Sequence, residues 1–173
     1  MGLRLVCLAL ILLTTGCHQQ TGEERAIAEV ERLGGKVRKD GQLPGTPVTR
    51  VQLTEGRVTD AELQVVKSFP QLRSLDLRRT PVTDKGMVHL ERLTKLQELY
   101  LDSTRITDAG LGRLEGLKEL RKLTLSDTEV SDLGLGFLNG LNDLEELSLT
   151  RTKVTEKGVQ RLRESLPKVD IRR

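Results

Sequence analysis

The chain contains four in-register copies of one 24-residue pattern, LxxLxLxxTxVT/SD/ExG. The copies begin at Leu72, Leu96, Leu120 and Leu144, and the last copy ends at Gly158. Self-similarity at a period of about 20 to 29 residues, with this leucine spacing, is typical of a solenoid in which each turn adds a strand and a short helix. Because each turn packs only on its neighbours, the array shares one continuous core. The repeat therefore predicts an α/β solenoid.

Alternation within each LxL segment predicts how the solenoid is layered. The two leucines are expected to point into the core, and the residues between them to the opposite face of a parallel sheet. We therefore predict a parallel sheet on the concave face and short helices on the convex face. A weaker first repeat starts at Val48, and a truncated last strand is predicted at Leu166, Val169 and Ile171. The solenoid is thus expected to cover residues 48–173, as about five repeats plus a closing strand.

Residues 23–47 predict an N-terminal cap made of a helix, a short strand and a loop. Ala26, Ile27, Val30 and Leu33 lie on one helical face, and Gly34 follows at the usual stop position. The segment GQLPGTP, residues 41–47, has the glycines and prolines of a loop. We expect this cap to cover the open N-terminal end of the core.

Residues 1–16 have the features of a secretory signal peptide, with Arg4, the apolar run LVCLALILL and a stretch of small residues. The apolar run is too short to span a membrane. The ending LTTGC resembles a bacterial lipobox, which implies cleavage after Gly16 and lipid attachment at Cys17. Residues 17–22 would then be a lipid-bearing tether, and the protein would be exported to the cell envelope and membrane-anchored. The alternative is an ordinary signal peptide cleaved near Gly16, with Cys17 incidental.

Composition narrows the possible partners. Export and the absence of interleaved aromatic residues, which make up only 2% of the chain, disfavour nucleic acid. Cys7 lies in the predicted signal peptide, so the mature chain is expected to have no disulfide. The C-terminal end is basic, which suits anionic lipid headgroups or an acidic partner; alternatively it is the polar outer face that a terminal repeat needs for solubility. Its candidate contact residues are Arg161, Arg163, Lys168, Arg172 and Arg173.

Each repeat carries a Thr or Ser followed by an acid, as in Thr107-Asp108. We expect the hydroxyl to cap a helix and the acid to interact with the helix dipole. In the first repeat, Glu62 is expected to complete a capping box with Thr59. These structural roles argue against catalysis by the regularly spaced acids. A second hydroxyl per repeat is expected to bond a turn backbone, at Thr80, Thr104, Thr128 and Thr152.

A glycine also recurs in each helical segment, at Gly86, Gly110, Gly134 and Gly158. Because Gly costs a helix about 1 kcal/mol relative to Ala, a packing or turn constraint is expected at these positions.

The sequence predicts no enzyme, cofactor or metal site. It has no HExxH, CxxC, GxSxG or phosphate-binding glycine loop. The histidines, His18 and His89, have no partner at the spacing of a known catalytic motif.

The repeats resemble the leucine-rich-repeat family. Their Thr-Asp-x-Gly form is similar to the short repeats of lipoproteins from planctomycete-like bacteria and to the helix-bearing repeats of F-box proteins. The segment AIAEVERLGGKV, followed by a Pro-Gly loop, resembles the N-terminal cap of those bacterial proteins. The resemblance covers residues 23–171 and implies a curved solenoid that binds protein ligands on its concave face. It does not imply ubiquitin-ligase activity, because no F-box segment precedes the repeats and the chain is predicted to be exported.

On the predicted concave face, charges alternate between neighbouring strands. Glu98, Lys122, Glu146 and Lys168 are expected to pair along one column, and Arg78 with Asp102 along another. Such pairs contribute little stability but neutralise the face.

The chain's only tyrosine interrupts this face and is the candidate anchor for a partner, because aromatic and Arg side chains dominate interfaces. The alternative is a tyrosine that lies on its own sheet. The face projects to roughly 400 Å², below the ~800 Å² per partner of a standard interface, so a peptide or a transient contact is expected. The candidate contact residues are Tyr100, Arg78, Asp76, Asp102 and Thr124.

A second candidate surface lies on the convex side. Leu133 and Phe137 occupy positions that are mostly polar in the other repeats, and they lie four residues apart on one helical face. An exposed apolar pair can mark a partner site, although isolated apolar surface residues are common.

We therefore predict a lipid-anchored, monomeric module that binds or scaffolds an unidentified protein or peptide in the bacterial cell envelope. The alternatives are a structural envelope protein without a specific ligand, and association with anionic membrane through the basic C-terminal end.

Overall fold

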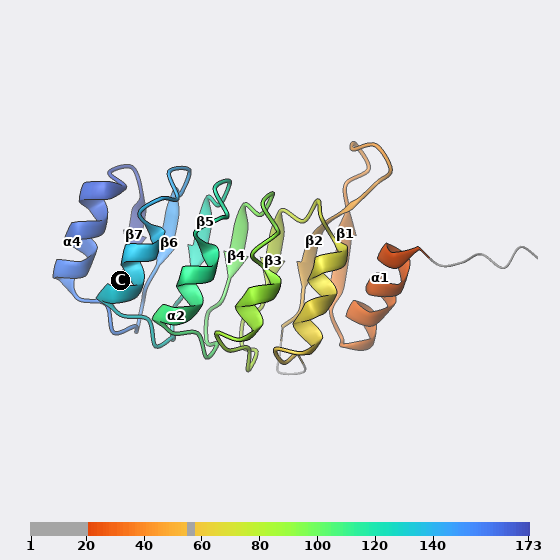
Figure 1. Cartoon of the computed structure of the whole chain (residues 1–173), viewed down its shortest axis with the longest axis horizontal. Helices are drawn as coiled ribbons and strands as arrows, with labels where there is room; N and C mark the ends of the chain where they lie inside the picture. The colour runs from red at the N-terminus through yellow and green to blue at the C-terminus, as the bar shows by residue number, and fades with distance from the viewer. Residues whose placement is uncertain (1–20, 55–57) are drawn as a thin grey trace, which may run out of the picture.

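The computed structural model describes residues 21–54 and 58–173, which form an elongated solenoid (Figure 1). Seven strands in this part of the chain form one sheet in sequence order. The first pair is antiparallel, and all later pairs are parallel. The strands are β1 (Lys36–Lys39), β2 (Val48–Gln52), β3 (Ser74–Asp76), β4 (Glu98–Tyr100), β5 (Lys122–Thr124), β6 (Glu146–Ser148) and β7 (Asp170–Arg172).

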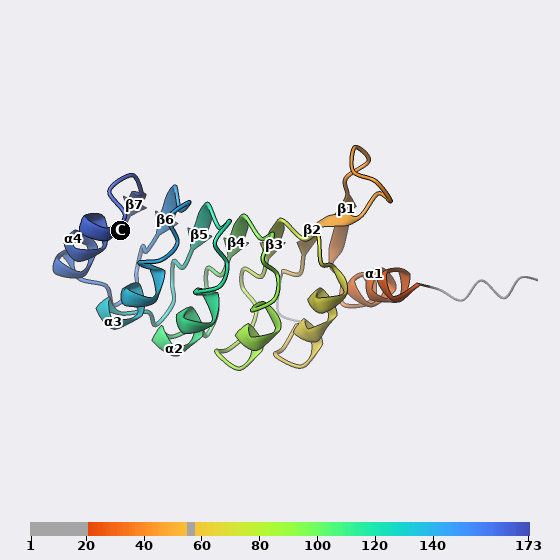
Figure 2. The ribbon, with the colours of Figure 1, turned by 45° about the horizontal axis from the view of Figure 1, so that its top comes forward.

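Short helices cover one face of this sheet. Figure 2 shows the strands on the inside of a shallow arc and the helices on its outside. The predicted α/β solenoid, with its sheet on the concave face, is confirmed. The helices are α1 (Gly22–Arg32), η1 (Glu62–Ser68), η2 (Gly86–His89), α2 (Asp108–Leu111), η3 (Gly112–Leu114), α3 (Asp132–Leu135), η4 (Gly136–Leu138) and α4 (Glu156–Ser165), the η elements being 3₁₀-helices.

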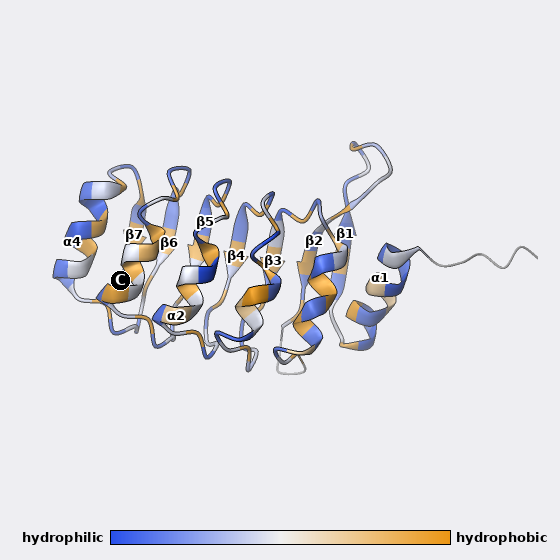
Figure 3. Ribbon diagram, in the orientation of Figure 1, coloured by the Kyte–Doolittle hydropathy of each residue, from blue (hydrophilic) through white to orange (hydrophobic). Residues whose placement is uncertain are grey.

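The inward leucines of the repeats form the core. Leu75, Leu99 and Leu123 stand in register on neighbouring strands, and each is fully buried. Among the described residues, the core contains one aromatic side chain, Phe69, at the position that Leu93 takes one repeat later. Figure 3 shows hydrophobic residues on both the strands and the helices. Aliphatic side chains therefore supply almost all of the packing.

A carboxylate in each repeat bonds to the start of the next helical segment. Asp84 accepts the Thr107 N–H at 2.8 Å through one oxygen and the Thr107 hydroxyl at 2.6 Å through the other. The predicted caps are present at Thr107, Ser131 and Thr155, but the acids also join adjacent repeats, which the sequence analysis missed. The same pair of bonds links Asp60 to Thr83, Asp108 to Ser131, and Asp132 to Thr155.

The recurrent glycines make room for these carboxylates. A Cβ atom on Gly86 would lie 2.6 Å from an oxygen of Asp60. In each later repeat, a Cβ at the equivalent position, Gly110, Gly134 or Gly158, would lie closer still to the acid of the preceding repeat. The packing constraint predicted for these glycines is therefore the close approach of a neighbouring carboxylate.

The first repeat obtains the same two bonds from within itself. Lys36, not an acid, stands 24 residues before Asp60, and Glu62 stands 24 residues before Gly86. Glu62 accepts the Thr59 N–H at 3.0 Å and also the Thr59 hydroxyl. The predicted capping box is thus only half formed, because η1 begins at Glu62 and has no side-chain cap. Glu62 substitutes for the missing acid, and the position does not need glycine.

The N-terminal cap consists of α1, β1 and the loop that leads to β2. Thr21 and Glu24 form a capping box at the start of α1, so Thr21 and Gly22, which we had placed in the tether, belong to the cap helix. Ala26 and Val30 are buried against the first repeat, and Gly34 takes a positive φ of 80° after the helix. The antiparallel β1 then extends the sheet at this end.

The last strand differs from its predicted register. Asp170 stands opposite Glu146, and Arg172 opposite Ser148, so the 24-residue spacing continues to the end of the sheet. The prediction had placed Lys168 opposite Glu146, and it is wrong because Lys168 precedes β7. Here one 10-residue α-helix, α4, replaces the short α-helix and 3₁₀ turn of the earlier repeats. Leu166, which the sequence assigns to the start of the strand, is the C-cap residue of this longer helix.

The predicted signal peptide and the lipid attachment site at Cys17 lie outside the described residues. Within residues 21–54 and 58–173, no helix is both long enough and apolar enough to cross a membrane.

Replacing Gly134 with Ala tests the role of the recurrent glycine. We expect Gly134→Ala to lower the free energy of unfolding by about 1 to 3 kcal/mol, because the new methyl group would overlap the Asp108 carboxylate. Gly136→Ala is the matched control, since nothing lies within 4 Å of its Cβ position, and Ala there is expected to add about 0.4 to 1 kcal/mol. Thermal unfolding followed by circular dichroism measures both variants. Equal midpoints for the two would contradict the packing constraint.

Candidate binding face

The concave face presents three columns of side chains along the sheet. The strand register defines the first column as Arg50, Ser74, Glu98, Lys122, Glu146 and Asp170. It defines the second as Gln52, Asp76, Tyr100, Thr124, Ser148 and Arg172. The third follows the strand ends and contains Thr54, Arg78, Asp102, Ser126 and Thr150.

Tyr100 lies half-buried at the centre of this face. Its hydroxyl donates to Glu98 Oε2 at 3.2 Å, and the Arg78 guanidinium carbon lies 5.3 Å from the centre of its ring. Burial raises the pKa of Tyr100, and the negative charge of Glu98 raises it further. The phenol is therefore neutral at physiological pH and offers a polar edge beside an aromatic surface that a cation partly covers.

Arg78 is held in place by Asp76, the last residue of β3. Its Nε and Nη2 atoms donate to the two oxygens of Asp76 at 2.9 and 2.6 Å, and its backbone N–H donates to the same carboxylate at 3.1 Å. Hydrogen bonding to Asp76 raises the pKa of Arg78. This bidentate pair fixes the guanidinium next to Tyr100 before any ligand arrives.

The predicted pair between Arg78 and Asp102 is not formed. Asp76 lies two residues before Arg78 and takes the guanidinium instead. Asp102 accepts the Ser126 N–H at 3.0 Å and the hydroxyl of Thr124. Thr124, a predicted contact residue, therefore positions Asp102.

In the first column, only some of the predicted pairs of opposite charges are formed. Lys122 Nζ lies 2.5 Å from Glu146 Oε2, as predicted, and this contact lowers the pKa of Glu146 and raises that of Lys122. The predicted Glu98–Lys122 pair is wrong, because Glu98 Oε2 instead accepts the hydroxyl of buried Ser74 at 2.8 Å. Glu98 therefore accepts hydrogen bonds from uncharged groups and forms no ion pair with Lys122.

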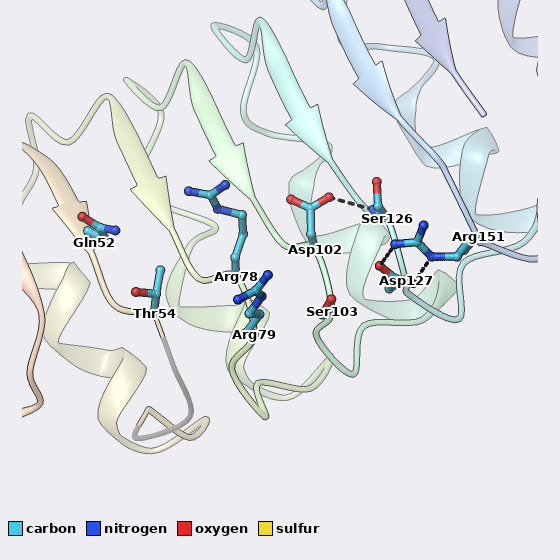
Figure 4. Close-up of a pocket in the computed structure, with 9 residues that line it drawn as sticks. All are labelled: Gln52, Thr54, Arg78, Arg79, Asp102, Ser103, Ser126, Asp127 and Arg151. Carbon is cyan, nitrogen blue, oxygen red and sulfur yellow. Dashed lines mark hydrogen bonds and ion pairs between the residues drawn. The ribbon is translucent and has the colours of Figure 1, made fainter.

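A polar hollow of about 540 Å³ opens beside these columns (Figure 4). It is lined by Gln52, Thr54, Arg78, Arg79, Asp102, Ser103, Ser126, Asp127 and Arg151. Arg151 closes one side through two bonds of 2.5 Å to Asp127. The Arg79 side chain has no hydrogen bond or ion pair in the described part of the chain.

Left-handed turn residues build the edge of this hollow, and the sequence analysis missed them. Arg79, Ser103, Asp127 and Arg151 have φ values of 59°, 56°, 58° and 56°. Each precedes a recurrent threonine whose hydroxyl bonds the turn carbonyl three residues earlier, as from Thr80 to Leu77 at 2.6 Å. The predicted threonine ladder is thus confirmed. The 24-residue spacing of these four positions was the available sequence signal.

The convex candidate surface contains exposed apolar side chains. Leu133 is 81% exposed and Phe137 38% exposed, and Val88, which sequence reasoning missed, is 42% exposed. A methyl group on Gly112 would lie 3.6 Å from the Phe137 ring, so this ring rests partly on the neighbouring repeat.

The basic C-terminal residues lie on different elements. Arg172 lies in the concave sheet, 3.5 Å from Asp170, and Arg173 bonds Val154 O at 2.9 Å and Glu156 at 3.3 Å. Arg161 and Arg163 are exposed on α4, and Lys168 on the segment before β7.

No group of three or more His, Cys, Asp or Glu side chains is placed to hold a metal ion within residues 21–54 and 58–173.

Comparison with known proteins identifies the repeat. A family model described as Leucine Rich repeat matches residues 70–90 and 92–114. No curated protein matches the sequence.

Three structures share the fold. The internalin InlF of Listeria monocytogenes is 22% identical with a TM-score of 0.50, covering 70% of this chain and 38% of the internalin. The leucine-rich-repeat ectodomain of the receptor kinase SOBIR1 of Arabidopsis thaliana is 19% identical with a TM-score of 0.52, covering 88% and 92%. A PEPR1–AtPEP1 structure is 16% identical with a TM-score of 0.50, covering 79% and 19%. The chain thus spans well under half of the internalin's length.

The environment of Tyr100 can be measured directly, because the chain has no other tyrosine and no tryptophan. We expect its phenol to ionise above the ordinary pKa of 10.0. Glu98→Gln should lower this pKa by removing a nearby anion, and Arg78→Met should raise it by removing a cation that favours the phenolate. Absorbance during an alkaline titration gives the three values. An identical pKa in the three proteins would contradict the contacts of Tyr100 with Glu98 and Arg78.

Proposed function

Because the chain is a leucine-rich-repeat protein, we propose that it is a binding module whose protein or peptide ligand contacts the concave face around Tyr100. The proposal includes an anchor at the envelope membrane through a lipid on Cys17.

One observation supports the concave face above the others: Tyr100 and a pre-positioned Arg78 stand beside the hollow. Aromatic and Arg side chains are the commonest anchors of protein interfaces. The bonds from Arg78 to Asp76 hold the guanidinium in one orientation, so less side-chain entropy is lost when a ligand binds. The hollow, of about 540 Å³, lies next to this pair and is lined by donors and acceptors.

The size of the face limits the ligand. Each of the strands β3 to β7 is three residues long, and the face projects to roughly 400 Å², about half of what one partner buries in a standard interface. An extended peptide, or an exposed loop of a protein, fits such a surface. A rigid globular partner would need additional contacts outside the sheet.

Crosslinking from the face itself tests this function. We propose to replace Tyr100 with the photoreactive residue p-benzoylphenylalanine, which keeps an aromatic ring at that position, and to place the same residue at Leu133 on the convex side as the control. Illumination in the native cells, followed by mass spectrometry, is expected to give one stoichiometric product from position 100 and none from position 133.

The other outcomes distinguish the alternative functions. A product from position 133 alone would move the ligand to the convex apolar surface. No product from either position would favour a structural envelope protein without a specific ligand, an alternative that the internal Lys122–Glu146 pair supports. Membrane association through the basic end is less favoured, because Arg172 and Arg173 already have acidic partners.

The anchor is tested separately with Cys17→Ser. We expect this variant to lose signal-peptide processing and the mass of the lipid, because a lipobox cysteine is both the modified residue and part of the cleavage site. Mass spectrometry of the mature N-terminus, together with cell fractionation, measures both effects. Unchanged processing and unchanged membrane retention would show that Cys17 is not the attachment residue.

A further inference from the structure

A second cavity lies at the N-terminal end of the concave face, and three arginines line it. Its volume is about 240 Å³. Arg38 comes from β1, Arg50 from β2, and Arg73 from the position just before β3. The complete lining is Arg38, Asp40, Thr49, Arg50, Arg73, Ser74, Gln97 and Glu98.

Two of these arginines stand directly opposite each other. Arg38 is the register partner of Arg50 in the antiparallel β1–β2 pair, next to the Val37–Val51 pair. Val51 is buried and Val37 packs against the core, so Arg38 and Arg50, on the alternate positions, face the concave side. Like charges directly opposite on neighbouring strands are destabilising. The sheet therefore maintains an electrostatic repulsion at this end.

The carboxylates of the same cavity bond to groups other than these arginines, and their two negative charges offset the three positive charges only in part. Asp40 accepts the Gln42 N–H at 3.0 Å, and Glu98 accepts the Ser74 and Tyr100 hydroxyls at 2.8 and 3.2 Å. Asp76, in the adjoining cavity, is bonded to Arg78. Within the described part of the chain, the side chains of Arg38, Arg50 and Arg73 have no hydrogen bond and no ion pair. Arg38, Arg50 and Arg73 thus line one cavity with two carboxylates that bond to other groups, which leaves one excess positive charge among the lining residues.

We propose that this arginine cluster, Arg38, Arg50 and Arg73, binds a carboxylate of an acidic segment in the protein or peptide ligand. The inference rests on the proposed function and names the chemistry of one part of the ligand. Guanidinium groups bind carboxylates through two parallel hydrogen bonds, and three of them converge here. The lining residues Arg50, Ser74 and Glu98 belong to one column of the sheet, and the strands form the inside of the shallow arc in Figure 2, so an extended chain can lie along them.

The position of the cluster also sets a spacing within the ligand. The cavity between β2 and β4 is lined by both Arg50 and Tyr100, so one ligand can cross from one to the other. Two strand spacings and an offset of two residues along the strand separate them, about 12 Å in all, which an extended chain covers in about three to four residues. The acidic residue of the ligand is therefore placed about three to four residues from the one that contacts Tyr100.

Titration with model peptides tests the cluster on the full chain. The probes are acetylated hexaglutamate and, as the uncharged counterpart, acetylated hexaglutamine, both measured by fluorescence anisotropy at low ionic strength. We expect the wild-type protein to bind hexaglutamate only, and Arg50→Gln to weaken that binding about tenfold. Arg92→Gln is the matched control, an exposed arginine that follows η2 on the helical side, and should bind as the wild type does.

The stability of the unliganded protein provides an independent measurement. Because Arg50→Gln removes a like-charge contact with Arg38, we expect its thermal midpoint to rise by about 1 to 3 °C while its hexaglutamate binding falls. A variant that simply unfolded would show a lower midpoint. The opposite signs of the two effects therefore separate loss of a binding group from loss of structure.

Three binding results would overturn the proposal, and a fourth result, from crosslinking, would do so as well. The first is equal hexaglutamate binding by Arg50→Gln and the wild type, and the second is equal binding of hexaglutamate and hexaglutamine. The third is Arg50-dependent binding to vesicles of phosphatidylglycerol and phosphatidylcholine without hexaglutamate binding, which would assign the cluster to lipid headgroups. If Arg50→Gln still crosslinks its partner from position 100 at the wild-type yield, the acidic-segment inference fails while the binding function stands.

Discussion

The carboxylate that passes from one repeat to the next is the interaction on which the rest of the solenoid depends. A leucine core is uniform along the array and would tolerate slippage between repeats, whereas a bond pair such as Asp84 to Thr107 has one geometry. This bond pair requires a hydroxyl at the helix start, an acid beside it and a glycine opposite the acid of the preceding repeat. The bond pair therefore explains why the hydroxyl, the acid and the glycine recur in the repeats. It also holds the strands in the register that defines the concave columns.

Regular features were predictable from the sequence, because each recurs at the same spacing and has a local cause. The strand order, the threonine ladder and the helix caps of the later repeats followed from periodicity and capping chemistry. The last strand was misplaced because Leu166 and Val169 suggested a strand, although they follow the longer α4 and are buried beneath it. For the position of the last strand, the 24-residue spacing was a better predictor than the leucine pattern.

The partners of the charged residues in the candidate site could be predicted only in part, because each such residue has two or more neighbours at similar distances. Arg78 could reach Asp102 across the sheet or Asp76 two residues before it, and the structure has the second pair. Glu98 could reach Lys122, yet it accepts from Ser74 and Tyr100. Which of the two possible bonds forms depends on the orientation of the side chain, and the sequence does not specify that orientation. The hollow was missed for another reason: turn residues with positive φ, such as Arg79, build its edge.

The two ends of the carboxylate ladder show how an array of this kind can change its length. An internal unit brings the glycine that receives the preceding acid and the acid that the following unit receives, so duplicating or deleting 24 residues leaves every junction matched. The first and last described units differ from the internal ones: Glu62 supplies the bonds of the first repeat from within, and Glu156 accepts a bond from Arg173. The number of internal units is thus free to vary. Each added unit would lengthen the concave face by one strand and so enlarge the ligand that the protein can accommodate.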